Sequence, residues 1–315
     1  MADMEGRILV TGAVGQIGSE LTMALREAYG GSNVVAAGHI TEPQETLRDS
    51  GPFVTLDVRN RSEIVRVVED YQVATIYHMA AILSAVGEQH PDMAWDVNVN
   101  GLLNVLETAR EVGLRKIFVP SSMAVYGPDV PRDLAPQEAA LNPTTMYGIT
   151  KLAGEALVRN YILNYGLDIR GLRYPGVISS ETPPGGGTTD YAVEIFYAAA
   201  ASGHYRCFVR EDTVLPMMYM PDCIRATRGL MDAPADGLRY PAGYNVEGMS
   251  FSAGALVEEV RKYLPGLSCS FIPDERQVIA DSWPLRLDDS AARSDWDWQP
   301  EFGLEQMVED MMACV

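Results

Sequence analysis

The sequence predicts an α/β fold in which a doubly wound parallel sheet is followed by a smaller C-terminal lobe. Up to Pro175, short apolar runs alternate with stretches of helical periodicity, which is the pattern of a parallel sheet covered by helices on both faces. Beyond Pro175 the alternation loosens, and Gly, Pro and Thr become frequent. We therefore expect shorter helices and strands in the second part of the chain.

The elements of the first part follow in order. Five short apolar runs bounded by turn residues are predicted as buried strands: RILVTG, NVVAAG, TIYHMAA, KIFVPSS and DIRGLRYP. Apolar residues recur every three or four positions in four stretches, which predicts helices at 16–29, 63–71, 94–113 and 148–166. We assign the sheet domain to residues 1–176, with a later segment at about 210–232 returning to it, and most of the smaller lobe to 177–315.

A glycine-rich turn, VTGAVGQIG, joins the first predicted strand to the first predicted helix. Gly12 permits a tight turn, Gly15 lets the backbone approach a pyrophosphate, and Gly18 lets the helix pack closely on the strand. The spacing is G-x-x-G-x-x-G, so the motif alone is also compatible with a turn that holds no ligand. Its position between a strand and a helix favours a Rossmann-type dinucleotide site, with the phosphates at the helix N-terminus.

Further cofactor contacts are expected where later strands end, because ligands of open parallel sheets bind at the carboxyl ends of the strands. Asp57 can accept a hydrogen bond from an adenine amino group, and a helix cap at the surface is the alternative. Asn98 is expected to form hydrogen bonds to the backbone and to groups that face the cofactor. A hydrogen bond within the core is the other interpretation, and the two are compatible. The segment HMAA offers small residues beside the cofactor, and its His78 is expected to pack at the strand end.

One position departs from the pattern of NAD-binding sheets. An Asp or Glu about 20 residues beyond the glycine turn ordinarily binds the adenosine ribose. Here that position is Gly38, followed by His39. A switch to NADP is one interpretation, yet no Lys or Arg stands nearby in the sequence, and Glu42 would repel a phosphate. We expect NAD, held less tightly through backbone groups or His39.

A second set of residues has the spacing of a catalytic site. Tyr147 and Lys151 are four residues apart at the start of a predicted helix, and therefore share one face. A tyrosine ordinarily titrates near pH 10, and a nearby ammonium favours its phenolate. Tyr147 then removes a proton from a substrate hydroxyl while hydride leaves the same carbon. Ser122, at the end of a strand, holds that hydroxyl and stabilises the developing carbonyl oxygen.

On these motifs the chain resembles the extended short-chain dehydrogenase/reductases of the UDP-galactose 4-epimerase-like type. It is most similar to the L-threonine 3-dehydrogenases among them. The resemblance covers nearly the whole chain and is most specific in LSAVGE, RYPGVIS, PGGGTTDYAVEIF, LPMMYMPDCIRAT, YNVEGMSF and DSWPLRLDDSAARSDWDW. It implies an enzyme that oxidises L-threonine at its 3-hydroxyl to 2-amino-3-oxobutyrate with NAD and without zinc, as a homodimer.

The resemblance also implies roles for individual residues. The catalytic positions of the family match Ser122, Tyr147 and Lys151. The substrate positions match Ser84, Thr188, Thr189 and Trp283, beside Ser122 and Tyr147. The cofactor positions match Gly12, Gly15, Gln16, Ile17, Asp57, Tyr147, Lys151 and Val177, to which we add Gly18, His39, Val58, Ala80 and Asn98.

A second glycine-rich turn, Gly185–Gly187, precedes Thr188 and Thr189. We expect a helix to start near Thr188, so that its N–H groups and the threonine hydroxyls bind the carboxylate of the substrate. No Lys or Arg lies between Val177 and Tyr205 to do so. The alternative is an ordinary helix cap with Thr or Asp at the N-cap. The group that binds the substrate ammonium stays open.

Composition limits the remaining alternatives. The chain has 43 acidic and 24 basic residues, a net charge of −19, which disfavours nucleic acid and anionic membranes as partners. Four scattered cysteines predict neither a metal site nor disulfides, in keeping with a cytoplasmic enzyme. A nucleotide-sugar epimerase or dehydratase would need arginines for a diphosphate, and Arg206 and Arg210 are the first after Arg173. A non-catalytic NAD-sensing protein would not need Ser122, Tyr147 and Lys151.

Overall fold

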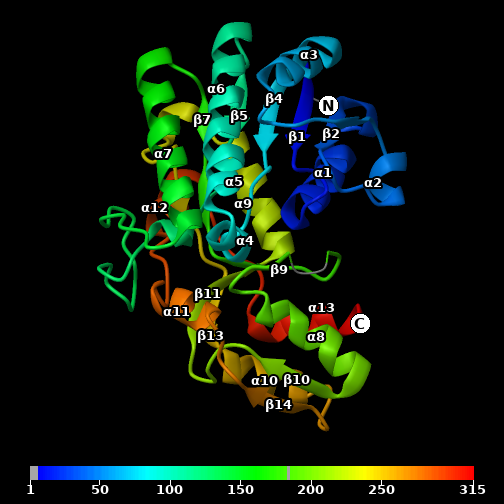
Figure 1. The fold of residues 1–315 in the computed structure, drawn as a ribbon, viewed down its shortest axis with the longest axis vertical. Coiled ribbons are helices and arrows are strands. Elements are labelled where there is room, and N and C mark those ends of the chain that lie inside the picture. The colour runs from blue at the N-terminus through cyan, green and yellow to red at the C-terminus, as the bar shows by residue number, and fades with distance from the viewer. Residues whose placement is uncertain (1–5, 183–184) are drawn as a thin grey trace.

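The computed structural model describes residues 6–182 and 185–315. Met1–Glu5 and Pro183–Pro184, the latter at the start of PGGGTTD, lie outside the described residues. A six-stranded parallel sheet in the order β3-β2-β1-β4-β5-β7 forms the centre of the larger part (Figure 1). Its strands are β1 Arg7–Thr11, β2 Val34–Gly38, β3 Phe53–Thr55, β4 Val73–His78, β5 Lys116–Phe118 and β7 Ile169–Arg170.

Helices cover both faces of this sheet, because neighbouring residues of each buried strand point to opposite sides. Ile8 and Val10 of β1 share one apolar core with α1 and α9, whereas Leu9 shares another with α3, α6 and α7. These helices are α1 Gln16–Tyr29, α3 Arg61–Tyr71, α6 Gly101–Val112, α7 Met146–Tyr165 and α9 Met220–Asp232. The predicted fold, a doubly wound parallel sheet, is confirmed.

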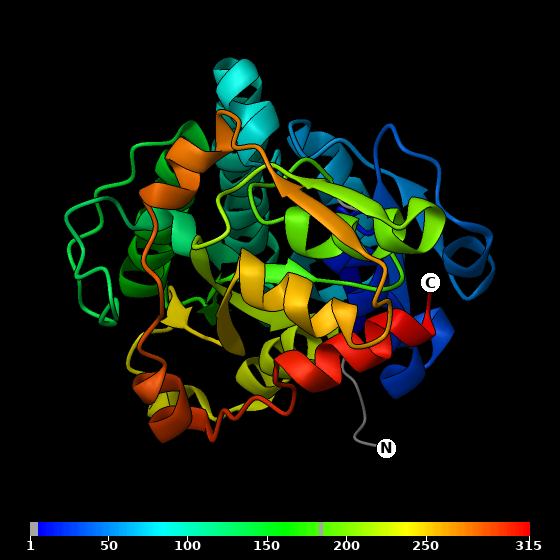
Figure 2. The same ribbon diagram turned by 90° about the horizontal axis from the view of Figure 1, so that it is seen from below.

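The smaller part lies below the sheet in Figure 1 and has its own apolar core. It contains a three-stranded sheet in the order β13-β11-β9 and a parallel pair, β10 and β14. Its strands are β9 Gly176–Ile178, β10 His204–Cys207, β11 Val214–Tyr219, β13 Met249–Ser252 and β14 Ser268–Phe271. Its helices are α8 Tyr191–Ser202, α10 Ala253–Arg261, α11 Arg276–Asp281 and α13 Leu304–Ala313. Figure 2 shows α10 and α13 side by side in this lobe.

The remaining elements are short. The helices are α2 Glu45–Asp49, α4 Ser84–Gln89, α5 Pro91–Trp95 and α12 Ser290–Trp296. A π-helical turn spans Asp96–Asn100, and 3-10 turns span Gly31–Asn33, Met123–Val125 and Ala235–Gly237. The strands are β6 Ser121–Ser122, β8 Leu172–Tyr174 and β12 Tyr244–Asn245, which form a sheet in the order β12-β8-β6.

Two predicted strands are interrupted in the structure. Residues 116–122 divide into β5 and β6, and residues 168–175 divide into β7 and β8. Pro120, between β5 and β6, has no N–H group for a continuous ladder. Gly171 lies so close to its neighbours that a Cβ atom there would be 2.6 Å from the Val119 carbonyl oxygen. This bend takes Ser122 out of the central sheet and into the β12-β8-β6 sheet, where β6 pairs with β8.

The predicted division into 1–176 and 177–315 stays a prediction. Within the segment 210–232, α9 packs against α1. The apolar core that contains Ile8 and Val10 of β1 also includes Tyr244 and Trp298. Segments beyond residue 232 therefore also pack against the larger part.

Candidate active site

The first glycine turn fits a dinucleotide phosphate. Gly12 has a φ of 65°, and a Cβ atom there would lie 2.5 Å from the backbone nitrogen of Ala80. A Cβ atom at Gly18 would lie 2.1 Å from the Gly12 carbonyl oxygen. Gly15 is the N-cap of α1, whose first turn contains no acidic residue to repel a phosphate. The backbone N–H groups at this helix start therefore form a cradle that side chains would fill.

A cavity of about 220 Å³ connects this turn with the residues of the predicted catalytic set. Its lining includes these residues named in the sequence analysis: Gly12, Gly15, Gln16, Ile17, Gly18, Ser84, Ser122, Tyr147, Lys151, Val177, Thr188, Thr189 and Trp283. Both parts of the molecule contribute to the lining, because α7 and β6 belong to one side and residues 187–190 to the other. The site therefore lies between the glycine turn and the smaller lobe.

Tyr147 and Lys151 reach this cavity from the first turns of α7. Thr145 is the N-cap of α7, and its hydroxyl accepts a hydrogen bond from the Gly148 N–H at 3.1 Å. Lys151 Nζ donates to the Pro120 carbonyl oxygen at 2.8 Å, which fixes the ammonium beside β6. Ser122, at the end of β6, accepts from the Ala124 N–H at 3.2 Å.

Burial moves the pKa values of both helix residues. It raises the pKa of Tyr147 to about 12, and hydrogen bonding with Ser122 acts in the opposite direction. It lowers the pKa of Lys151 to about 8. Near neutral pH the pair is thus a phenol and an ammonium.

Five of the predicted cofactor contacts do not line the large cavity: His39, Asp57, Val58, Ala80 and Asn98. Ala80 and Asn98, together with His78, line a small space of about 20 Å³ that Lys151 also borders. The Asn98 amide accepts from the Ile82 N–H at 2.7 Å and donates to Thr150 Oγ1 at 3.0 Å, so it ties the loop after β4 to α7. His78 is buried, its Nδ1 pairs with the Thr11 hydroxyl at 2.9 Å, and burial lowers its pKa to about 3.

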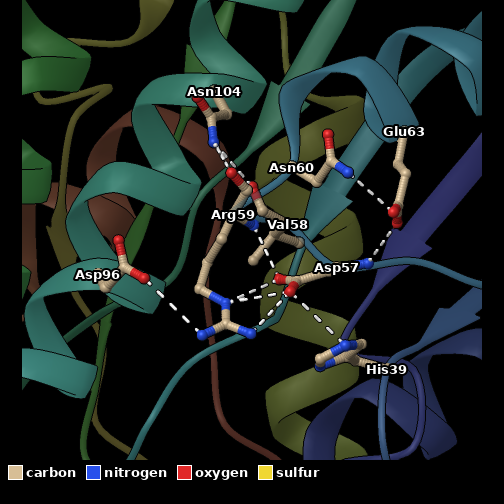
Figure 3. A network of polar contacts seen from close by, with 8 residues as sticks. All are labelled: His39, Asp57, Val58, Arg59, Asn60, Glu63, Asp96 and Asn104. Atoms are coloured by element: carbon tan, nitrogen blue, oxygen red, sulfur yellow. Dashed lines mark hydrogen bonds and ion pairs between the residues drawn. The ribbon is translucent and has the colours of Figure 1, made fainter.

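The edge expected to meet the adenosine half of a cofactor lies at the ends of β2 and β3 (Figure 3). His39 Nε2 lies 3.5 Å from Asp57 Oδ2, and Arg59 Nη2 donates to the same oxygen at 2.7 Å. The sequence predicts no Lys or Arg near this edge. That prediction is wrong, because the side chain of Arg59 folds back onto Asp57. Hydrogen bonds from Arg59 lower the pKa of Asp57. Val58, the remaining predicted contact, is buried beside them.

The second glycine turn differs from the prediction. The helix that follows, α8, begins at Tyr191, and not near Thr188. Asp190 is the N-cap, as the alternative interpretation expects, but its side chain does not cap the helix: its carboxylate turns back and accepts from the N–H groups of Gly186 and Gly187 at 2.7 Å each. These N–H groups are therefore engaged within the turn. Thr188 is buried, with its hydroxyl 3.4 Å from that of Ser84.

The sequence suggests Asp190 only as an alternative helix cap, yet Asp190 also lines the cavity. The signal was present in TTDY, but an aspartate before a helix is usually read as a cap. Burial raises the pKa of Asp190. Trp283, only 5% exposed, closes the same cavity from the loop after α11. In residues 6–182 and 185–315, no three His, Cys, Asp or Glu side chains cluster as a metal site would require.

Comparisons with known proteins agree with this architecture. The sequence matches the NAD dependent epimerase/dehydratase family over residues 8–246, so the chain belongs to that family. The mitochondrial L-threonine 3-dehydrogenase of Bos taurus is 44% identical over 307 residues, which cover 97% of this chain and 82% of that protein.

Two solved structures are similar over almost all of both chains. The holo form of the GalE-like L-threonine dehydrogenase of Cupriavidus necator is 49% identical, with a TM-score of 0.94 over 98% of this chain and 99% of that one. A monomeric L-threonine 3-dehydrogenase from a metagenome is also 49% identical, with a TM-score of 0.93 over 97% of each chain.

Proposed function

We propose that this chain is an NAD-dependent L-threonine 3-dehydrogenase, which oxidises the 3-hydroxyl of L-threonine to give 2-amino-3-oxobutyrate. The observation that carries the proposal is the composition of one cavity. The glycine turn, the set Ser122, Tyr147 and Lys151, and the polar residues 188–190 all line it. The similar proteins described above, which match nearly the whole chain, bear the same name.

The residues of the cavity have distinct roles in this reaction. NAD, when bound, supplies the acceptor for the hydride that leaves C3 of threonine. Tyr147 removes the proton from the 3-hydroxyl, and Ser122 holds that oxygen as it becomes a carbonyl. Lys151 places a positive charge one helical turn away, which favours the phenolate of Tyr147. The fixed bond from Lys151 to Pro120 keeps that charge in place.

Threonine carries a carboxylate and an ammonium in addition to the reacting hydroxyl. We assign the carboxylate to the hydroxyls of Thr188 and Thr189, with Ser84 beside them. Asp190 is the acidic residue among the described lining of the cavity, and we assign the ammonium to it. Its contacts to Gly186 and Gly187 hold the carboxylate in one orientation.

The alternatives fit the site less well. A nucleotide-sugar epimerase or dehydratase must bind a diphosphate, yet Lys151 is the only Lys or Arg in the described lining of the cavity. Arg210, one candidate from the sequence, pairs with Asp281 at 2.7 Å, outside this cavity. A protein that only senses NAD would have no use for a Ser–Tyr–Lys set that faces a substrate-sized space.

We further propose a homodimer formed through α6 and α7, which expose Leu103, Ile149 and Leu163. Light scattering after size exclusion tests this, and a monomer would contradict it without affecting the reaction proposed. No helix in residues 6–182 and 185–315 has the length and apolar character needed to cross a membrane. Cys207 and Cys223 are free and buried, which agrees with the proposed cytoplasmic location.

The direct experiment follows the absorbance of reduced NAD after mixing the purified chain with NAD and L-threonine. We expect turnover with L-threonine, none with UDP-galactose, and full activity in the presence of EDTA. Epimerisation leaves no net reduced NAD, so UDP-galactose is assayed separately by chromatography of the products, and its conversion to UDP-glucose alone would favour the epimerase. Cofactor binding without turnover of either substrate would favour the sensing protein. Loss of activity with EDTA that zinc restores would contradict the mechanism.

A further inference from the structure

Gly38 lacks room for the carboxylate that NAD-binding sheets ordinarily place there. Gly38 is buried at the end of β2, and a Cβ atom on it would lie 3.0 Å from Phe53 Cζ and 3.1 Å from Val14 Cγ1. An aspartate would therefore require both side chains to shift by a few tenths of an ångström. The packing around β2 thus suits a residue without a side chain, which leaves the adenosine ribose to be recognised by another group.

We propose that His39, oriented by the Asp57–Arg59 ion pair, binds the adenosine ribose in this chain and replaces the missing acid as the determinant of NAD specificity. This inference rests on the proposed function, because it concerns the cofactor of the same site. It assigns a ligand-binding role to His39 and a positioning role to Arg59. Figure 3 shows the three side chains converging at one edge of the sheet.

The carboxylate of Asp57 is held by several hydrogen bonds. Arg59 donates to it from the backbone N–H at 3.0 Å, from Nε at 3.0 Å and from Nη2 at 2.7 Å. The loop that carries both residues is fixed in turn by Asn104, whose Nδ2 donates to the carbonyl oxygens of Val58 at 3.0 Å and Arg59 at 2.9 Å. A carboxylate fixed in this way can orient a neighbouring imidazole at little entropic cost.

His39 is the group that this carboxylate orients. It follows Gly38, so it stands one residue beyond the position where a ribose-binding side chain is expected, and its side chain is 43% exposed. Nε2 faces Asp57 Oδ2 at 3.5 Å, so a tautomer with its proton on Nε2 directs that proton at the carboxylate. The lone pair of Nδ1 is then free to accept a hydrogen bond from a ribose hydroxyl.

The charges at this edge favour NAD over NADP. Arg59 is already bidentate on Asp57, and its Nη1 lies 3.8 Å from Asp96. Glu63 also faces this loop, accepting from the Asp57 N–H at 3.1 Å. The carboxylates of Asp57 and Asp96 thus face one guanidinium, so a 2′-phosphate would meet a cation whose charge is already matched. The preference for NAD over NADP therefore depends on the ion pair between Asp57 and Arg59.

Titration calorimetry with NAD and NADP, in the absence of threonine, tests the inference. We expect His39→Ala to weaken NAD binding about 5- to 20-fold, the scale of one hydrogen bond assisted by a charged neighbour. His39→Gln, which keeps a donor and an acceptor, should recover part of the affinity. His204→Ala, at another exposed histidine, is the matched control and should bind NAD normally.

Asp57→Asn provides the decisive comparison, because it removes a carboxylate and frees Arg59. We expect NAD to bind at least tenfold more weakly and NADP more tightly, so that their ratio of dissociation constants shifts toward NADP. A role limited to loop stability would weaken both cofactors equally, and that result would overturn the inference, as would unchanged NAD binding by His39→Ala. Thermal melting checks that each variant folds. Because binding is measured without substrate, failure here leaves the proposed oxidation of threonine untouched.

Discussion

The ammonium nitrogen of Lys151 lies 5.5 Å from the centre of the Tyr147 ring, one turn further along α7. At this separation the charge interacts favourably with the face of the ring. Both side chains are partly buried, and desolvation raises the pKa of Tyr147 to about 12 and lowers that of Lys151 to about 8. Each group thus resists ionisation in the ligand-free protein, and the first two predictions concern this pair.

Tyr147→Phe removes one oxygen atom and preserves the ring that packs beneath Lys151. If Tyr147 is the general base, kcat should fall by about 10²–10⁴-fold, while NAD binding measured by calorimetry stays close to that of the unmodified chain. Tyr263→Phe, at an exposed tyrosine, is the control and should be fully active. A decrease in kcat of less than tenfold with intact folding would exclude Tyr147 as the base.

Lys151→Met should stabilise the ligand-free protein at pH 7, even though it abolishes activity. The pKa of Lys151 is about 8 in the folded state and 10.5 when exposed, so the unfolded chain binds more protons between these values. The burial cost of the charge is fully present below pH 8 and disappears as the pH rises toward 10.5. We expect Lys151→Met to gain about 1–3 kcal/mol at pH 7, and less at pH 10.

Urea unfolding at the two pH values measures this difference. Lys262→Met, at an exposed lysine, controls for the general effect of removing a positive charge. If the stability difference between Lys151→Met and the unmodified chain were the same at pH 7 and pH 10, the result would contradict a desolvation cost for charged Lys151 in the folded protein.

Thr188→Ala removes a buried hydroxyl from the cavity. We expect a loss of about 1–3 kcal/mol in kcat/KM for threonine, the usual cost of an unmet hydrogen bond to a charged group. Steady-state kinetics measure this loss, and Thr46→Ala, on the exposed helix α2, is the matched control. Lower thermal stability with unchanged kinetics would assign Thr188 to packing alone.

Asp190→Asn should weaken recognition of the substrate ammonium by about 1.5–3 kcal/mol in kcat/KM. Asparagine keeps an oxygen that can accept from the N–H groups of Gly186 and Gly187, so the turn should persist. The informative measurement compares L-threonine with 3-hydroxybutyrate, which lacks the amino group. If Asp190 binds the ammonium, the variant should lose activity toward threonine only, whereas equal losses would indicate that it merely shapes the turn.

Local patterns predicted much of this site, and tertiary contacts account for the rest. The alternation of strands and helices, and the four-residue spacing of Tyr147 and Lys151, are properties of short segments that survive folding unchanged. The start of α8 was misplaced because the Asp190 carboxylate turns back to the glycine turn, a preference that no periodicity reveals. The sequence does not place Arg59 beside His39, because each of the two residues contacts Asp57 and they follow different strands.

Gly38→Asp tests whether an acid at the end of β2 can be restored. Gly38 does not have a positive φ, so the backbone tolerates a side chain, but Phe53 and Val14 crowd its first atom. Alone, the substitution should therefore lower the melting temperature. Combined with Val14→Ala, which opens space, it should tighten NAD by about 1–2 kcal/mol, the scale of one charge-assisted hydrogen bond.

The same double variant should bind NADP more weakly, because the new carboxylate repels a 2′-phosphate. Measuring kcat/KM and dissociation constants for both cofactors, with Val14→Ala alone as the control, separates the effect of the acid from that of the cavity. The unmodified chain should already prefer NAD, since Asp57 occupies Arg59. Equal or better turnover of the unmodified chain with NADP would contradict this and make Gly38 a specificity switch.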